Sequence, residues 1–175
     1  MQAALEAGLA PLPPDKPRLW FGSTPPRLAF PLVRAGLDLF DTSYPSHATE
    51  RDCALVFPVH WPPDTERGSL HPGPAEICLA DPEHRLAMEP LVAGCTCHAC
   101  TTFTRAYLHH LVSVKEMLAR VLLQIHNIHH YQTFFSSLHN ALQCDQLDLF
   151  QQAVLGTSSP QPDSDLGPPA KNAKH

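Results

Sequence analysis

The chain has 175 residues, of which 43% are hydrophobic and 17% are charged, so it is long enough for one modest domain with its own core. Its formal net charge of −5 excludes a protein that grips nucleic acid through bulk positive charge, and no apolar run approaches the roughly 18 residues of a transmembrane helix. Residues 1–10 contain Glu6 and no basic segment before a long apolar stretch, so we expect no secretory signal. Without export, the six cysteines are expected to stay reduced, and a metal site is the better interpretation of those that cluster.

The first elements expected along the chain form a strand–helix–strand unit. Apolar strands are expected at 18–22 and 37–42, and the apolar residues of 26–35 recur at helical spacing between them. Pro31 opposes this helix, because a proline inside a helix removes a backbone hydrogen bond, whereas Gly36 is a typical end for it. A strand, a short helix and a strand make a βαβ unit, which predicts two parallel strands.

The middle of the chain is rich in turn residues. Prolines and glycines are frequent between 58 and 90, whereas 53–57 and 76–79 are apolar. We expect these two short apolar segments to pair as a hairpin that is joined by a long loop.

Two stripes of apolar residues at helical spacing follow a cluster of cysteines. The first consists of Leu108, Leu111, Val112, Leu118, Leu122 and Ile125, and the second of Ile128, Tyr131, Phe135, Leu138 and Leu142. We therefore expect two amphipathic helices that meet near His126. From Gly156 the chain is rich in Ser, Pro, Asp, Lys and Asn and lacks apolar anchors, which predicts a disordered tail over 156–175.

Three cysteines lie within six positions, at Cys95, Cys97 and Cys100, after a glycine that suits a tight turn. Thiolate sulfur and imidazole nitrogen are the ligands that zinc prefers, and a structural zinc site has four of them. A redox pair or inert buried thiols fit this C-x-C-x-x-C run less well than a metal site. The fourth ligand is open among seven histidines: His98, His109, His110, His126, His129, His130 and His139.

Position along the expected helices favours His126 among these histidines. It follows the apolar Ile125 at the expected end of the first helix, so its side chain can face inward, although spacing alone does not exclude the others. Each remaining histidine is expected to be a solvated helix residue. A site of three cysteines and one histidine has no open coordination position, which predicts a structural role and not a catalytic one.

The sequence around the cysteine cluster resembles the tRNA-guanine transglycosylases. Residues 94–100, 104–111 and 125–127 match that family's C-x-C-x-x-C run, its TRAYLHHL segment and its histidine–asparagine pair. The resemblance implies one zinc ion per chain. The implied ligands are Cys95, Cys97, Cys100 and His126.

Two upstream segments, 17–22 and 36–41, resemble the last βα unit of the same family's barrel. The resemblance implies an α/β fold class: the C-terminal part of a TIM (β/α)8 barrel of the tRNA-guanine transglycosylase type with a zinc-binding helical subdomain. Such a barrel takes about 250 residues, so the chain is expected to be a C-terminal portion without the earlier strands. The expected segments are an irregular N-terminal segment (1–16), the last barrel βα unit (17–57), a loop-rich insertion with a hairpin (58–90), the zinc-binding helical subdomain (91–150) and the tail (156–175).

The family includes catalytic chains and a non-catalytic accessory chain, and the details of this sequence resemble the accessory chain. Residues 39–45 and 49–55 match the accessory pattern, as do the 58–90 insertion and the segment 130–135. Asp41 matches the family's nucleophile, an aspartate that attacks the ribose C1′ of tRNA. Because the family's second aspartate and its base pocket belong to earlier strands, the resemblance implies that Asp41 is inactive here and caps the next segment.

The implied function is that of the accessory subunit of a heterodimer that exchanges guanine for queuine at wobble position 34 of tRNAs with GUN anticodons (Asp, Asn, His and Tyr), forming queuosine. The implied partners are the catalytic subunit and, through the complex, tRNA. Two alternatives stay open: a catalytic transglycosylase with Asp41 as nucleophile, and a zinc-stabilised RNA-binding module in which Arg105, Lys115 and Arg120 line one face. The resemblance also implies a cytoplasmic location with peripheral association at the mitochondrial outer membrane.

Overall fold

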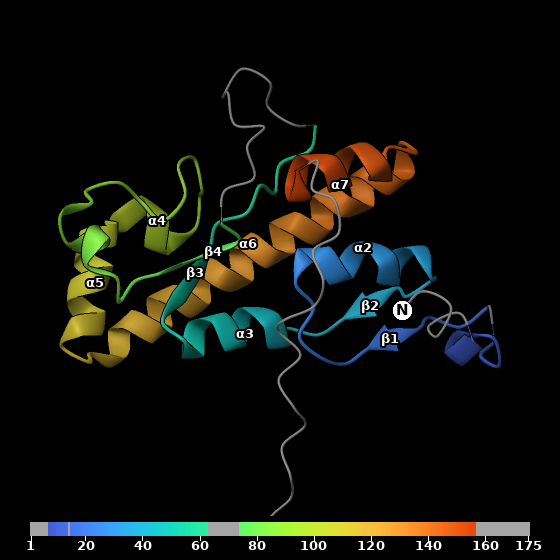
Figure 1. Ribbon diagram of the computed structural model, residues 1–175, viewed down its shortest axis with the longest axis horizontal. Helices are drawn as coiled ribbons and strands as arrows, with labels where there is room; N and C mark the ends of the chain where they lie inside the picture. Colours follow the sequence, from blue (N-terminus) through green and yellow to red (C-terminus); the bar gives the residue numbers. More distant parts are fainter. Residues whose placement is uncertain (1–6, 14, 63–73, 157–175) are drawn as a thin grey trace, which may run out of the picture.

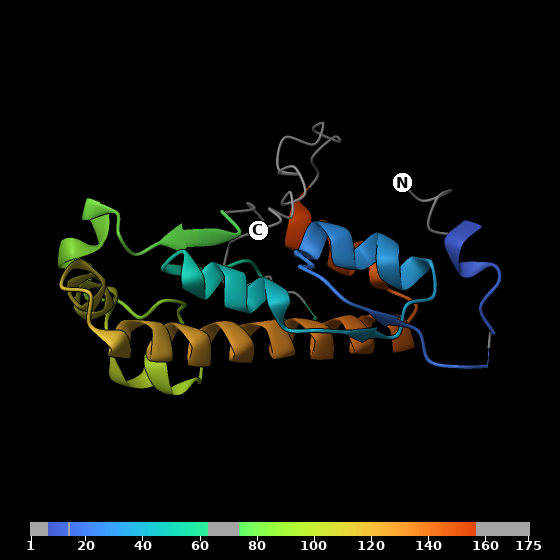
Figure 2. The same ribbon diagram turned by 90° about the horizontal axis from the view of Figure 1, so that it is seen from below.

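A computed structural model of the chain describes residues 7–13, 15–62 and 74–156. The elements are, in chain order, β1 (Leu19–Trp20), α2 (Pro26–Arg34), β2 (Leu39–Phe40), α3 (Ser43–Glu50), β3 (Cys53–Leu55), β4 (Glu76–Cys78), η2 (Pro82–Leu86), α4 (His98–Thr102), α5 (Arg105–Ser113), α6 (Met117–Gln143) and α7 (Leu147–Leu155). Helix α6 runs along most of the structure, with α2 and α3 on one side of it and α4 on the other (Figure 1 and Figure 2). In this described part, no helix is long and apolar enough to cross a membrane. The predicted tail beyond Gly156 and residues 63–73 of the predicted insertion lie outside the described residues.

The predicted strand–helix–strand unit is confirmed. Strands β1 and β2 pair in parallel and α2 connects them, with Pro31 accommodated inside the helix. The helix ends in a Schellman motif, in which Gly36 adopts the left-handed conformation (φ +88°) and donates its N–H to the carbonyl of Val33. The next residue, Leu37, donates to the carbonyl of Leu32. Both strands are only two residues long, shorter than predicted.

The predicted hairpin is also confirmed. Strands β3 and β4 are antiparallel, with Cys53 opposite Cys78 and Leu55 opposite Glu76. Strand β3 contacts α6 along one side and β4 along the other. The backbone of this short strand therefore lies within reach of the side chains of α6.

The prediction that two helices meet near His126 is wrong. The chain breaks earlier, after α5, where Lys115 adopts a left-handed backbone conformation (φ +57°), and α6 then continues for 27 residues. No glycine or proline lies within α6. The buried residues Leu123, His126 and Asn127, followed by others at helical spacing, form one continuous face. His126 therefore lies in the middle of a long helix.

Two hydrophobic cores lie along α6. The first core contains Ala29, Phe30, Tyr44, Ala48, Leu55, Phe57, Val59, Tyr131, Phe134, Leu138, Ala141, Phe150 and Val154. The second core contains Ala54, Leu79, Leu91, Cys97, Ala99, Cys100, Leu108, Leu111, Ala119, Leu122 and Leu123. In the first core the rings of Phe30, Phe134 and Phe150 pack with centroids 5.8 Å apart in each pair. Helix α7, which the sequence analysis did not predict, contributes Phe150 to this cluster.

Candidate metal centre

The structure brings the four predicted zinc ligands together into a largely buried group, here called the Cys3His group. Its members are Cys95, Cys97, Cys100 and His126, and their ligand atoms all lie within 4.8 Å of one another. The Nδ1 atom of His126 lies 3.9, 3.5 and 3.3 Å from the sulfurs of the three cysteines in chain order. In a tetrahedral site with Zn–S bonds of about 2.3 Å and a Zn–N bond of about 2.0 Å, sulfur and nitrogen are separated by about 3.5 Å. The group therefore fits a tetrahedral zinc ion in both ligand type and spacing.

The three cysteines come from a tight turn and the first turn of α4. Gly94, in the left-handed conformation (φ +78°), reverses the chain immediately before Cys95. Cys97 is the N-cap of α4, and its sulfur accepts a hydrogen bond from the backbone N–H of Cys100 at 3.4 Å. Because the helix begins here, the side chains of Cys97 and Cys100 lie on the same side of it.

The orientation of His126 is fixed by strand β3. Its Nε2 atom lies 2.9 Å from the carbonyl oxygen of Leu55. Since a carbonyl can only accept a hydrogen bond, Nε2 carries a proton, and Nδ1 is the ring nitrogen that faces the sulfurs. A backbone carbonyl in this position is typical of the partners that orient a metal-binding histidine.

The electrostatics of the group favour a thiolate at Cys97 and a protonated thiol at Cys100. Burial acts to lower the pKa of His126, but hydrogen bonds to Cys95 and Cys97 outweigh it and raise the pKa to about 9. The hydrogen bond from the Cys100 side chain lowers the pKa of Cys97 to about 3, and the same bond raises the pKa of Cys100. Metal binding requires these thiols to lose their protons, so a cation would replace protons that the group otherwise shares.

The prediction that the remaining histidines are solvated is wrong for His130. This residue is 2% exposed, and its Nε2 lies 2.9 Å from the carbonyl oxygen of Phe57. Burial lowers its pKa to about 3, so it is neutral in the fold. His130 follows His126 by one helical turn, and this spacing is the sequence signal that places it on the same buried face. His98, His110 and His139 are exposed, as predicted, whereas His109 and His129 are half-buried and Nδ1 of His109 lies 2.7 Å from the carbonyl oxygen of Leu79.

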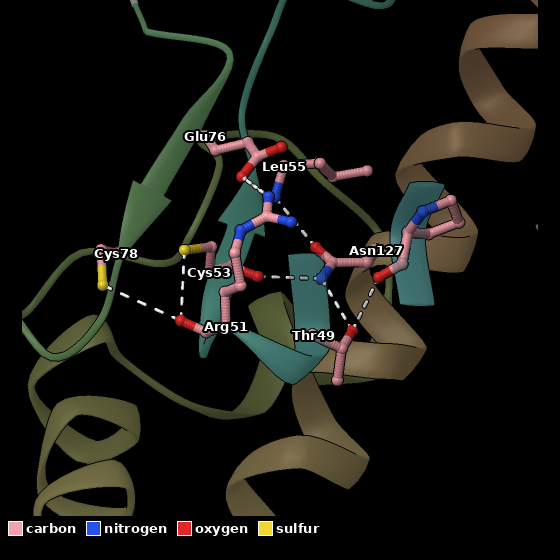
Figure 3. Close-up of polar contacts among 8 residues, drawn as sticks. Thr49, Arg51, Cys53, Leu55, Glu76, Cys78 and Asn127 are labelled. Atoms are coloured by element: carbon pink, nitrogen blue, oxygen red, sulfur yellow. Dashed lines mark hydrogen bonds and ion pairs between the residues drawn. The ribbon is translucent and has the colours of Figure 1, made fainter. Parts of the chain in front are cut away.

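Asn127 is a structural residue to which the sequence analysis assigned no role. It is fully buried, and its Oδ1 accepts a hydrogen bond from the N–H of Leu55 at 2.9 Å. Its Nδ2 donates to the hydroxyl of Thr49 and to the carbonyl of Cys53, both at 3.0 Å. Figure 3 shows that these bonds join α3, β3 and α6 next to the residue that orients His126. Buried polar groups must be paired, so this network fixes how the three elements meet.

Asp41 lies at the carboxyl end of β2, apart from the Cys3His group. One carboxylate oxygen accepts from the N–H of Ser43 at 3.0 Å, and the other accepts from the Ser43 hydroxyl at 2.8 Å and the Gly22 N–H at 3.1 Å. The hydrogen bond from the Ser43 backbone is the main cause that lowers the pKa of Asp41. The carboxylate thus joins the end of β1 to the start of α3.

The basic residues proposed for an RNA-binding face are partly engaged within the chain. Arg105 donates to the carbonyls of Pro90 and Leu91, at 3.0 and 2.9 Å. Arg120 forms an ion pair with Asp52 at 3.1 Å. The contacts of Arg105 disfavour the alternative in which this side chain reaches outward to phosphates, whereas the side chain of Arg120 is 61% exposed.

Comparison with known proteins identifies a matching family model and a set of similar relatives. Residues 1–159 match the family model described as Queuine tRNA-ribosyltransferase. Among relatives named "Queuine tRNA-ribosyltransferase accessory subunit 2", the Xenopus laevis protein is 36% identical over 176 residues, which cover 86% of this chain and 42% of that protein. The Ixodes scapularis protein is 43% identical over 137 residues (77% and 35%), and the Homo sapiens protein is 34% identical over 175 residues (86% and 42%). The chain spans about two fifths of the length of most of these curated relatives.

Proposed function

The chain belongs to the queuine tRNA-ribosyltransferase family, and we propose that it acts there as a non-catalytic accessory subunit. The observation that carries this proposal is its 34–43% identity to relatives that are named accessory subunit 2. In this role the chain would pair with a catalytic subunit that exchanges guanine for queuine at wobble position 34 of tRNAs with GUN anticodons. The complex would contact tRNA in the cytoplasm, with peripheral association at the mitochondrial outer membrane.

We further propose that the Cys3His group holds one Zn²⁺, through the three sulfurs and Nδ1 of His126. The donor types and the separations of 3.3–3.9 Å support this assignment. A bound zinc ion would offset two of the three thiolate charges and cross-link α4 to α6. With four protein ligands and no open position, the site would be structural.

The architecture of the whole protein is also a proposal. We propose that β1, α2 and β2 form the last βα unit of a TIM barrel of the tRNA-guanine transglycosylase type. The parallel pairing of β1 with β2 through α2 supports this view. The division into a barrel unit (17–57), an insertion (58–90) and a zinc-binding subdomain (91–150) is proposed on the same basis.

Partner binding gives the direct test of the accessory role. When the chain is mixed with the catalytic queuine tRNA-ribosyltransferase subunit, the two are expected to elute together from a sizing column with a mass equal to the sum of one copy of each. Light scattering on the eluting peak provides the mass. Separate elution of two folded monomers at micromolar concentration would contradict the proposal.

The catalytic alternative makes a different prediction about Asp41. If the chain is accessory, Asp41→Asn in this chain should leave the exchange rate of the reconstituted complex within about twofold of the original rate. The amide oxygen of asparagine can still accept from the Ser43 N–H, but its NH2 group cannot accept from the Gly22 N–H, so the melting temperature of the variant is measured beside the rate. The measurement is incorporation of labelled guanine into tRNA, with denaturing gels to detect a covalent adduct. Loss of exchange, or an adduct on this chain that the substitution removes, would make Asp41 a nucleophile.

A further inference from the structure

A second pair of cysteines lies outside the Cys3His group. Cys53 on β3 and Cys78 on β4 are both half-buried and stand directly opposite each other in the hairpin. Figure 3 shows that their sulfurs converge on one acceptor, the carbonyl oxygen of Arg51. The distances from that oxygen are 3.3 Å to the sulfur of Cys53 and 4.0 Å to the sulfur of Cys78.

The register of the hairpin brings these two side chains close together. The bonds from the Val56 N–H to Ala75 and from the Leu79 N–H to Asp52 identify the hydrogen-bonded pairs of the ladder. Cys53 and Cys78 lie between these pairs and therefore form a non-hydrogen-bonded pair. In such pairs the Cα atoms are about 4.5 Å apart and the side chains are at their closest. This separation lies within the roughly 4.4–6.8 Å that a disulfide spans.

We propose that Cys53 and Cys78 form a reversible disulfide across the β3–β4 hairpin when the chain meets a hydroperoxide. With hydrogen peroxide, the deprotonated sulfur of Cys78 attacks one oxygen, and an S–O bond forms as the O–O bond breaks. Cys78 becomes a sulfenic acid, and the other oxygen takes up the released proton and leaves as one water. The sulfur of Cys53 then attacks the sulfur of Cys78, the S–O bond breaks, and a second water carries away the proton of Cys53. Two thiols are oxidised to one disulfide, and the hydroperoxide is reduced by two electrons.

The environment of the two sulfurs supports this order of steps. Burial, followed by the charge of Cys78 and a hydrogen bond to it, raises the pKa of Cys53 to about 12. Cys53 is therefore a neutral thiol and a poor first nucleophile, so the first attack on the hydroperoxide falls to Cys78. Cys53 suits the second step because the register holds its sulfur next to the sulfenic acid, and it loses its proton as it attacks. A sulfenic acid with a neighbouring thiol in register forms a disulfide and is not oxidised further to a sulfinic acid.

The bond would act on the strand that positions both functional groups described above. Strand β3 supplies the Leu55 carbonyl to His126 and the Cys53 carbonyl to Asn127. A covalent link from β3 to β4 would hold this strand in place when the hairpin would otherwise open.

Peptide mapping of the full chain tests the proposal. The chain is treated with hydrogen peroxide, remaining thiols are alkylated, and a digest without reductant is analysed by mass spectrometry. A cross-linked peptide that joins Cys53 to Cys78, lighter by two hydrogen atoms than the reduced pair, is expected to be the most abundant intrachain disulfide. It should disappear after addition of dithiothreitol.

Two variants control this experiment. Cys144→Ser removes an exposed cysteine at the end of α6 and should leave the cross-link unchanged. Cys78→Ser should abolish it, with Cys53 recovered in alkylated form. The proposal is overturned if Cys53 and Cys78 both remain alkylatable after oxidation of Cys144, or if either one is joined instead to Cys144 or to the Cys3His group.

Discussion

Replacement of Cys97 by alanine is expected to lower the zinc content from about one ion per chain to near zero and to disrupt the second core. Cys97 is 5% exposed, and its sulfur lies 3.5 Å from Nδ1 of His126. It also caps α4 by accepting from the N–H of Cys100, so its loss removes a ligand and a helix cap together.

The expected size of this effect is large compared with the stability of a domain. Structural zinc contributes about 10–16 kcal/mol of apparent binding free energy in small zinc peptides, and whole domains are stable by only about 5–15 kcal/mol. Loss of only part of the zinc-binding free energy would therefore be enough to unfold α4 and α5. Metal analysis by mass spectrometry and thermal denaturation by circular dichroism would measure both parts of the prediction. A chelator should reproduce the result in the unmodified chain.

Cys144→Ala provides the matched control for Cys97→Ala. Cys144 is exposed and lies at the C-cap of α6, so its removal should change neither the zinc content nor the melting temperature. If Cys97→Ala retained a full complement of zinc, with an unchanged melting curve, the assignment of the Cys3His group would be incorrect.

Replacement of Asn127 by leucine should give the second large effect, a loss of about 3–5 kcal/mol in the free energy of unfolding. Leucine fills a similar volume but leaves the buried N–H of Leu55 and the carbonyl of Cys53 without their partner. Each buried group left unpaired costs about 1–3 kcal/mol. Because the same strand orients His126, zinc affinity should fall as well.

Urea denaturation followed by circular dichroism would measure this change. Asn140→Leu is the control, since Asn140 lies on the same helix with an exposed side chain, and a change within about 0.5 kcal/mol is expected there. Equal midpoints for the two variants would show that the Asn127 network contributes little to stability.

The sequence predicted correctly those elements whose signal lies within a few consecutive residues. The parallel strand pair, the hairpin and the end of α2 at Gly36 all follow from short signals and are present in the structure. The cysteine spacing predicted three members of the Cys3His group. Position favoured His126, but the family resemblance was needed to assign it, because seven histidines are chemically able to bind a metal and the packing of α6 against β3 is not visible in the sequence.

The division of α6 into two helices failed for a physical reason. His126, Asn127 and His130 are polar residues on the buried face, and each is satisfied by a backbone or side-chain partner from outside α6. They interrupt the apolar pattern at the point where the helix passes between the two cores. A pattern of hydrophobic residues therefore shows a boundary there, although the backbone has none. Contacts of this kind lie about 70 residues apart in the sequence and are not visible as periodicity.

Helix α6 has a consequence for the cooperativity of the chain. Its 27 residues extend for about 40 Å, and both cores are completed by side chains from this one segment. Unfolding of the part of α6 that packs in one core would also loosen the adjoining turns, which pack in the other core. The two cores are thermodynamically linked, so damage at the metal centre is transmitted along the helix to the aromatic cluster near the C-terminus of α6.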